Sequence, residues 1–147
     1  MRFYLDTCSL NRPLDDQSQY RVRMETIAVV EILRQIEDGL HQLLASTYLL
    51  VEVRKNPDME HQTEVLNTLQ RLARLARASD AIEARAHHLE SLGLRTYDAL
   101  HVAAAEAGNA DCLLTTDDRL LNFARRNATV LTVRVANPLA WIKEQTP

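Results

Sequence analysis

Short apolar segments alternate with longer amphipathic segments along this 147-residue chain. The stretches at residues 2–6, 42–45, 112–116 and 129–133 have the length and composition of buried strands. Between them, apolar residues recur every three or four positions, which is typical of helices that bury one face. Strands that alternate with helices pair in parallel, because the helix provides the crossover that parallel strands need. The sequence therefore predicts one domain over residues 1–147, an α/β fold with a central parallel sheet covered on both faces.

The expected helices have recognisable boundaries. The first begins near Asp16 or Ser18 and stops at Gly39, and a short helix carrying Glu52 ends before Pro57. Further helices are expected over residues 58–77, 80–93, 97–106, 119–126 and 138–143. The first helix is expected to bury Val22, Thr26, Val29, Leu33 and Ile36 and to expose Arg21, Glu25, Glu31, Arg34 and Asp38. Arg71, Arg74 and Arg77 are expected on the outer face of the helix over 58–77.

The composition excludes several classes of protein. The chain is 46% hydrophobic and 25% charged, as in globular proteins, and no apolar run approaches the ~20 residues of a membrane helix. A net charge of −3 argues against binding nucleic acid by bulk electrostatics. Because the chain begins on a strand-like segment, we expect no signal peptide. Cys8 and Cys112 lack metal-ligand spacing, and we expect both to be buried and reduced, as in a cytoplasmic protein.

Four acidic residues occur where this fold would bring them to one edge of the sheet. Asp6 and Asp117 close predicted strands, whereas Glu52 and Asp98 lie on predicted helices just past loops on the same edge. In parallel sheets, ligands bind beyond the carboxyl ends of the strands. Each aspartate alone has an ordinary explanation, because it would also cap or charge the first turn of a helix. Capping does not require all four on one edge, whereas binding of a divalent cation does.

Four motifs surround these acids: Leu5-Asp-Thr-Cys-Ser-Leu-Asn, Thr47-Tyr-Leu-Leu-Val-Glu, Tyr97-Asp-Ala-Leu-His-Val-Ala-Ala-Ala and Asp111-Cys-Leu-Leu-Thr-Thr-Asp. In order and spacing they resemble the PIN domain, most nearly the stand-alone VapC-like ribonuclease toxins. The resemblance extends to the Asn137-Pro-Leu-Ala-Trp ending, and the last two motifs are its most specific part. It implies a three-layer α/β/α sandwich and an endoribonuclease that depends on Mg²⁺ or Mn²⁺.

The resemblance also implies roles for individual residues. The acidic quartet of the family matches Asp6, Glu52, Asp98 and Asp117, of which Asp6, Asp98 and Asp117 would ligate the metal. Glu52 would ligate through water or orient the nucleophile. The supporting polar positions match Thr7 or Ser9, together with Thr116. Asp118 is an alternative to Asp117, although Asp117 directly follows the two threonines of the strand.

Partners follow from the same resemblance: an RNA substrate, a cognate antitoxin and a second copy in a homodimer. Arg12 and Arg54 are candidates for contacts to RNA phosphates, because each lies near an acidic motif. His101 shares a helix face with Asp98 and is a candidate proton donor, although a histidine on such a face is more often structural. The alternative function is a PIN-like module that binds RNA or protein without cleavage. A dehalogenase-like phosphatase is disfavoured, because Cys8 stands where its second carboxylate is needed.

Overall fold

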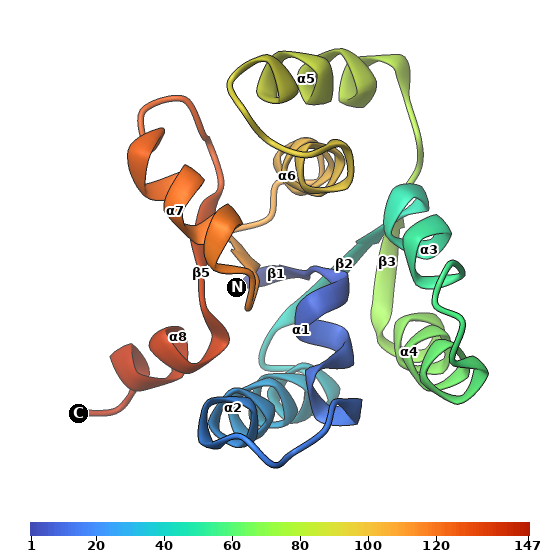
Figure 1. Cartoon of the computed structure of the whole chain (residues 1–147), viewed down its shortest axis with the longest axis vertical. Helices are drawn as coiled ribbons and strands as arrows, with labels where there is room; N and C mark the ends of the chain where they lie inside the picture. Colours follow the sequence, from blue (N-terminus) through green and yellow to red (C-terminus); the bar gives the residue numbers. More distant parts are fainter.

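The computed structural model describes residues 1–147 and is built on a five-stranded sheet in which every strand pair is parallel (Figure 1). The strands are β1 (Arg2–Leu5), β2 (Gln42–Ser46), β3 (Ala73–Ala76), β4 (Cys112–Leu114) and β5 (Arg134–Ala136). Their order is β3-β2-β1-β4-β5. The chain thus moves outward from β1 in one direction and then returns to continue from β4 in the other. This reversal places a topological switch point between β1 and β4, where ligands of such sheets bind.

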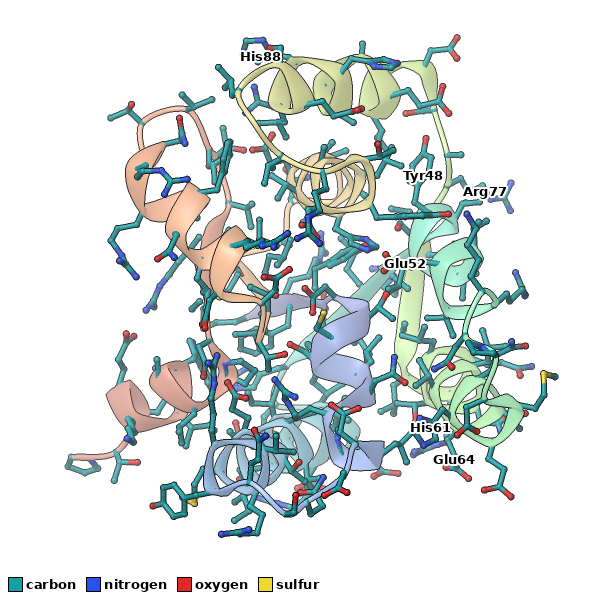
Figure 2. All side chains as sticks on the ribbon, in the orientation of Figure 1. Tyr48, Glu52, His61, Glu64, Arg77 and His88 are labelled. Carbon is teal, nitrogen blue, oxygen red and sulfur yellow. The ribbon has the colours of Figure 1, made fainter.

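Helices cover both faces of the sheet, which confirms the predicted three-layer α/β/α sandwich. They are α1 (Thr7–Asn11), η1 (Arg12–Leu14, a 3₁₀ helix), α2 (Tyr20–Glu37), α3 (Thr47–Val53), α4 (Met59–Leu72), α5 (Asp80–Ser91), α6 (Thr96–Ala107), α7 (Asp118–Arg126) and α8 (Pro138–Gln145). In Figure 1, α2, α4 and α8 lie on one side of the sheet and α5, α6 and α7 on the other. The short helices α1 and α3 directly follow β1 and β2, and Glu52 of α3 faces the space between α1 and α6 (Figure 2). No helix combines the length and the apolar run required to cross a membrane.

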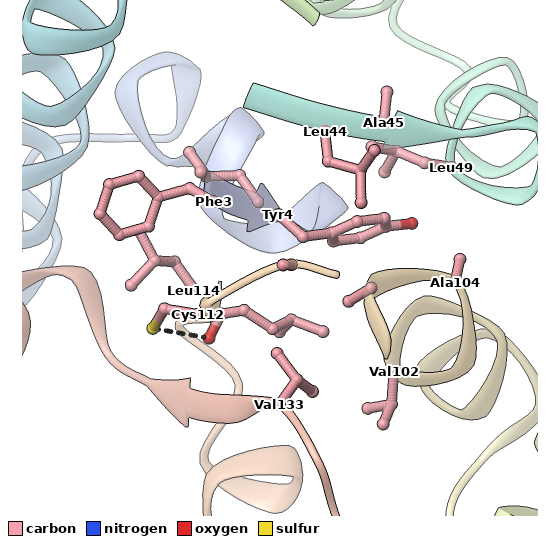
Figure 3. Packing of buried hydrophobic residues seen from close by; sticks show 14 of the residues in the cluster. Phe3, Tyr4, Leu44, Ala45, Leu49, Val102, Ala104, Cys112, Leu114 and Val133 are labelled. Carbon is pink, nitrogen blue, oxygen red and sulfur yellow. Dashed lines mark hydrogen bonds between the residues drawn. The ribbon is translucent and has the colours of Figure 1, made fainter. Parts of the chain in front are cut away.

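The central strand β1 anchors both helical layers. Phe3 and Tyr4 point to opposite sides of the strand, as successive residues of a strand must (Figure 3). The Phe3 ring packs edge-on against Trp141 of α8, with ring centroids 4.8 Å apart. On the other face, the Tyr4 ring lies 5.6 Å from His101 of α6. Both β1 side chains are fully buried, so the end of this strand is held rigidly where Asp6 follows it.

Two of the predicted elements were wrong. The helix expected over 58–77 ends at Leu72, and residues 73–76 form the edge strand β3, which pairs with β2 from Leu43 to Ser46. The sequence Ala-Arg-Leu-Ala favours a helix, so tertiary pairing overrides local propensity here. Arg71 therefore lies on a helix whereas Arg74 lies on a strand, and the predicted arginine face does not exist.

The last strand is the second correction. It was expected at 129–133 and instead comprises Arg134–Ala136. Residues before it bond to side chains outside the sheet: Val130 O accepts from Arg85 Nη2 (2.7 Å) and Thr132 N donates to Glu106 Oε1 (3.2 Å). These bonds satisfy backbone groups that would otherwise pair with β4.

Residues near the predicted site also differ from expectation. Residues 7–11, where the sequence predicted no helix, form the helix α1. Cys8 on this helix is exposed, whereas Cys112 is buried as expected, and both thiols are free. Glu25 was expected on the exposed face of α2, but its side chain is buried, because α8 packs against this helix and supplies a partner for the carboxylate.

Candidate functional site

Asp6 and Asp117 flank the switch point of the sheet. Asp6 directly follows β1, and its backbone N–H donates to Leu114 O at the end of β4 (3.2 Å). Its carboxylate caps α1 by accepting from Ser9 N (2.9 Å) and is 2% exposed. Asp117 comes three residues after β4 and caps α7 by accepting from Arg119 N (2.8 Å). The capping roles are therefore present, and one oxygen of each carboxylate remains outside these caps.

Glu52 and Asp98 approach from the two helices beside the switch point. Glu52 lies near the end of α3, and Asp98 lies in the first turn of α6. The Oε1 atom of Glu52 accepts from His101 Nε2 (2.8 Å) and from Thr7 Oγ1. One carboxylate oxygen thus ties α1, α3 and α6 together. The second oxygen, Oε2, has no partner among these residues.

The four carboxylates influence one another electrostatically. Burial, followed by the negative charges of Asp6 and Asp117, raises the pKa of Asp98 to about 6, and Glu52 adds to the effect. Burial likewise raises the pKa of Asp6, with a smaller contribution from Glu52. Burial opposes ionisation of Glu52 as well, but the hydrogen bonds from His101 and Thr7 prevail and lower its pKa. The region therefore concentrates negative charge that nearby cationic side chains do not fully compensate.

The donor set suits a hard divalent cation. Asp6, Asp98 and Asp117 offer only oxygen, the element that Mg²⁺ and Mn²⁺ prefer. The side chains do not form a ready cage: no group of three or more His, Cys, Asp or Glu is arranged to hold an ion directly. Mg²⁺ does not need such a cage, because it is usually bound through one or two carboxylates and keeps several waters. The raised pKa of Asp98 is the expected mark of carboxylates that a cation would stabilise.

Asp117 and its neighbour Asp118 have different surroundings. Asp118 forms a bidentate ion pair with Arg21, with both distances 2.8 Å, and this pair lowers its pKa. Its carboxylate is largely exposed on the outside of the turn. The charge of Asp117, in contrast, contributes to raising the pKa of Asp98 and of Cys8. The geometry therefore favours Asp117 as the member of the acidic group.

The family model of the PIN domain matches residues 3–126. The chain belongs to the PIN-domain family. Among solved structures it is similar to VapBC2 of Rickettsia felis bound to a promoter DNA fragment (TM-score 0.58, 18% identity, covering 93% of this chain and 98% of that chain). It is also similar to VapBC-1 of nontypeable Haemophilus influenzae (TM-score 0.58, 15% identity, 94% and 98% covered). Among curated proteins, none matches the chain in sequence.

A third similar structure is VapC20 of Mycobacterium tuberculosis, a toxin that cleaves the sarcin-ricin loop (TM-score 0.57, 13% identity, covering 82% of this chain and 93% of that chain). At these identities the likeness shows a shared fold. The acidic residues of this PIN domain therefore have to be judged on their own geometry.

The supporting polar residues of the PIN domain lie around the acids. Thr7 donates to Glu52, and Ser9 Oγ donates to Leu114 O (3.0 Å), which fixes α1 to the end of β4. Thr116 is buried directly before Asp117. Thr7, Thr116 and Asp117 share a cavity of about 410 Å³, which Cys8, Asn11, Arg12 and Asp15 also line.

The two arginine candidates are placed differently. Arg12 reaches this cavity, but its guanidinium is already paired with Asp15 (3.1 Å) and Glu25 (3.1 Å). Arg54 lines another cavity, of about 550 Å³, between α3, α4 and β3. The structure thus brings Arg12 to the acidic group and leaves Arg54 beside an apolar groove.

Behind Glu52 lies a buried chain of hydrogen bonds that includes His101 and that the sequence did not predict. His101 Nδ1 lies 2.8 Å from Tyr4 OH, which lies 2.7 Å from Ser46 Oγ. Ser46 Oγ also accepts from Leu49 N (3.0 Å) and so caps α3. With a neutral imidazole, Ser46 donates to Tyr4, Tyr4 to His101 and His101 to Glu52, so each acceptor is satisfied. The available signal was the position of His101, one turn after Asp98.

Proposed function

We propose that this PIN domain is an endoribonuclease that depends on Mg²⁺ or Mn²⁺. The proposal rests on the placement of the four carboxylates beside the switch point, where burial and the charges of Asp6 and Asp117 raise the pKa of Asp98. Buried, mutually repelling carboxylates oppose folding and persist where function requires them. The cleavage of RNA by the structurally similar VapC20 supports the choice of substrate.

The acidic residues and Arg12 have different roles in the proposed reaction. Asp6, Asp98 and Asp117 would hold the cation, which when bound polarises the scissile phosphate and offsets its developing negative charge. Thr7 and His101 occupy Oε1 of Glu52, so that Oε2 is the oxygen available to orient the attacking water. In-line attack by water would leave 5′-phosphate and 3′-hydroxyl ends. Arg12 stands in the cavity beside Asp117, where it would face the RNA backbone.

The biological setting is proposed from the same comparisons. Two similar structures are VapBC complexes, which supports a cognate antitoxin as partner and the role of a toxin for this chain. We propose further that residues 1–147 act as one PIN-like unit, which forms a homodimer in the cytoplasm. The free thiols of Cys8 and Cys112 are compatible with that compartment.

The test is an RNA cleavage assay with purified protein. We expect cleavage with Mg²⁺ or Mn²⁺, loss of at least about 100-fold in rate with excess chelator, and recovery when the metal is restored. Labelled RNA ends should carry 5′-phosphates. Cleavage that continues in excess chelator would contradict the metal-dependent mechanism. Binding of RNA without cleavage at any metal concentration would support the non-catalytic module instead.

A further inference from the structure

Glu25 is a buried carboxylate that has no role in the proposed mechanism. It lies on α2 and is 1% exposed. A carboxylate this deeply buried is costly unless partners compensate its charge, and removal of one partner of a buried pair is strongly destabilising. The contacts of Glu25 therefore show which groups compensate its buried charge and what role the residue has.

Three segments meet at Glu25. Oε2 accepts from Asn137 Nδ2 (2.5 Å) and from Arg21 Nε (3.3 Å). Oε1 lies 3.1 Å from Arg12 Nη2, within ion-pair distance. Asn137 directly follows β5 and caps α8, since its Oδ1 accepts from Leu139 N (2.8 Å). Glu25 thus joins η1 and α2 to the start of α8, where Asn137 lies 112 positions further along the chain.

Arg21 extends this contact to the acidic group. Its Nε edge faces Glu25, whereas Nη1 and Nη2 donate to Asp118 (2.8 Å each). Nη2 also donates to Thr116 O (3.2 Å). Thr116 and Asp118 are the two neighbours of Asp117. Arg21 therefore binds the turn between β4 and α7 on both sides of Asp117.

How firmly Arg21 holds this turn depends on its contact with the buried carboxylate of Glu25. The Arg21 side chain is half exposed, and an exposed arginine–carboxylate pair alone contributes little order, because solvent competes and the side chain is flexible. A fixed, buried acceptor at Nε removes that freedom and sets the plane of the guanidinium. On its other side, Glu25 holds Arg12, which lines the cavity shared with Asp117.

We propose that Glu25 is a positioning residue, which acts through Arg21 to fix the Thr116–Asp118 turn and hence the carboxylate of Asp117. The role in catalysis rests on the proposed function, whereas the ordering of the turn does not. Misplacement of a metal-binding carboxylate by about 1 Å is enough to cost roughly 100-fold in rate. The role differs from simple stabilisation because its effect is local to the turn.

Glu25→Gln tests this role, with Glu31→Gln as the matched control. Glu31 lies on the same helix and pairs with Arg34 (2.8 Å), but the pair is exposed and outside the network. Amide hydrogen exchange of Arg119, whose N–H donates to Asp117, reports the order of the turn without metal or RNA. We expect about tenfold faster exchange in Glu25→Gln and unchanged exchange in Glu31→Gln.

Two further readouts connect the turn with the site. We expect Mn²⁺ to bind about tenfold more weakly to Glu25→Gln and kcat to fall about tenfold or more; in Arg21→Gln, which leaves the Arg12–Glu25 pair in place, KM for RNA should change less than about twofold. Arg21→Gln should reproduce these effects, and it serves as the second variant if Glu25→Gln does not fold, because Arg21 is half exposed.

The outcomes separate the two proposals. Unchanged Arg119 exchange in both Glu25→Gln and Arg21→Gln would overturn the positioning role, whether or not the protein cleaves RNA. Unchanged Mn²⁺ affinity and kcat together with faster exchange would overturn its link to the site. Wild-type protein that neither binds Mn²⁺ nor cleaves RNA would contradict the proposed function alone, since the exchange result stands without it.

Discussion

Asp98→Asn is expected to lower the rate of RNA cleavage by about 100-fold or more. Asparagine has nearly the same shape but lacks the charge that a divalent cation requires. It can still accept hydrogen bonds in the first turn of α6, so the fold should be preserved. Cleavage of a labelled RNA at saturating Mg²⁺ measures the effect. A variant that retains most of the wild-type rate would remove Asp98 from the mechanism.

The same substitution is expected to stabilise the metal-free protein, by about 1 kcal/mol after allowance for solvent screening. The pKa of Asp98 rises from 3.8 to about 6 in the folded state, so ionised Asp98 opposes folding. This cost to the free energy of folding is therefore absent below pH 3.8, grows as the pH rises and is complete above about pH 6. Thermal unfolding at pH 7 without metal should show a higher Tm for Asp98→Asn.

Asp80→Asn is the matched control for both effects. Asp80 is acidic and lies in the first turn of α5, as Asp98 does in α6, but it is exposed. Its replacement removes the same favourable interaction with the helix dipole and should leave cleavage unchanged, with a slightly lower Tm. Added Mg²⁺ should raise the Tm of the wild type and of Asp80→Asn and leave that of Asp98→Asn nearly constant. A lower Tm for metal-free Asp98→Asn would contradict the account of mutual repulsion.

The second large effect separates two adjacent aspartates. Asp117→Asn should lose about 100-fold or more of the cleavage rate, whereas Asp118→Asn should lose about tenfold or less. Asparagine is a good helix cap, so the bond from Arg119 N to position 117 survives and stability is little affected. Asp118 faces Arg21 on the outside of the turn, so its loss acts only through the position of its neighbour.

The measurement compares the RNA cleavage rates of the two variants at equal metal concentration. Comparable Tm values would show that differences in rate come from the site and not from unfolding. If Asp118→Asn were the inactive variant and Asp117→Asn active, the roles assigned to the two carboxylates would have to be exchanged. Equal and small losses in both variants would remove this turn from the metal site.

Much of the fold could be predicted from the sequence, because the pattern of apolar residues within each helix and strand is local. The strands at Arg2–Leu5 and Cys112–Leu114 are continuous apolar runs, because both faces of this parallel sheet are buried, and the stripe of α2 follows from the helical period. Strand β3 was not accessible, because its four residues have helical propensity and become a strand only by pairing with β2. The position of β5 likewise depends on side chains of α5 and α6 that bond to the preceding loop.

The candidate site was likewise predictable from the sequence only in part. The four acids could be selected because the ends of parallel strands meet at one edge, whatever the details of packing. The contacts that orient them depend on residues far apart in sequence: His101 reaches Glu52 across 49 positions, and Asn137 reaches Glu25 across 112. A polar residue on a helix is normally exposed, so periodicity assigned Glu25 to the wrong face.

Anomalous scattering from Mn²⁺ in crystals of the wild-type protein would show directly whether the acidic group binds a divalent cation. We expect at least one peak at the switch point of the sheet, within about 2–3 Å of carboxylate oxygens from two or more of Asp6, Asp98 and Asp117. The peak should be absent in Asp98→Asn crystals grown under the same conditions. Mn²⁺ bound only elsewhere, or unchanged binding in that variant, would show that Asp6, Asp98 and Asp117 do not form the metal site.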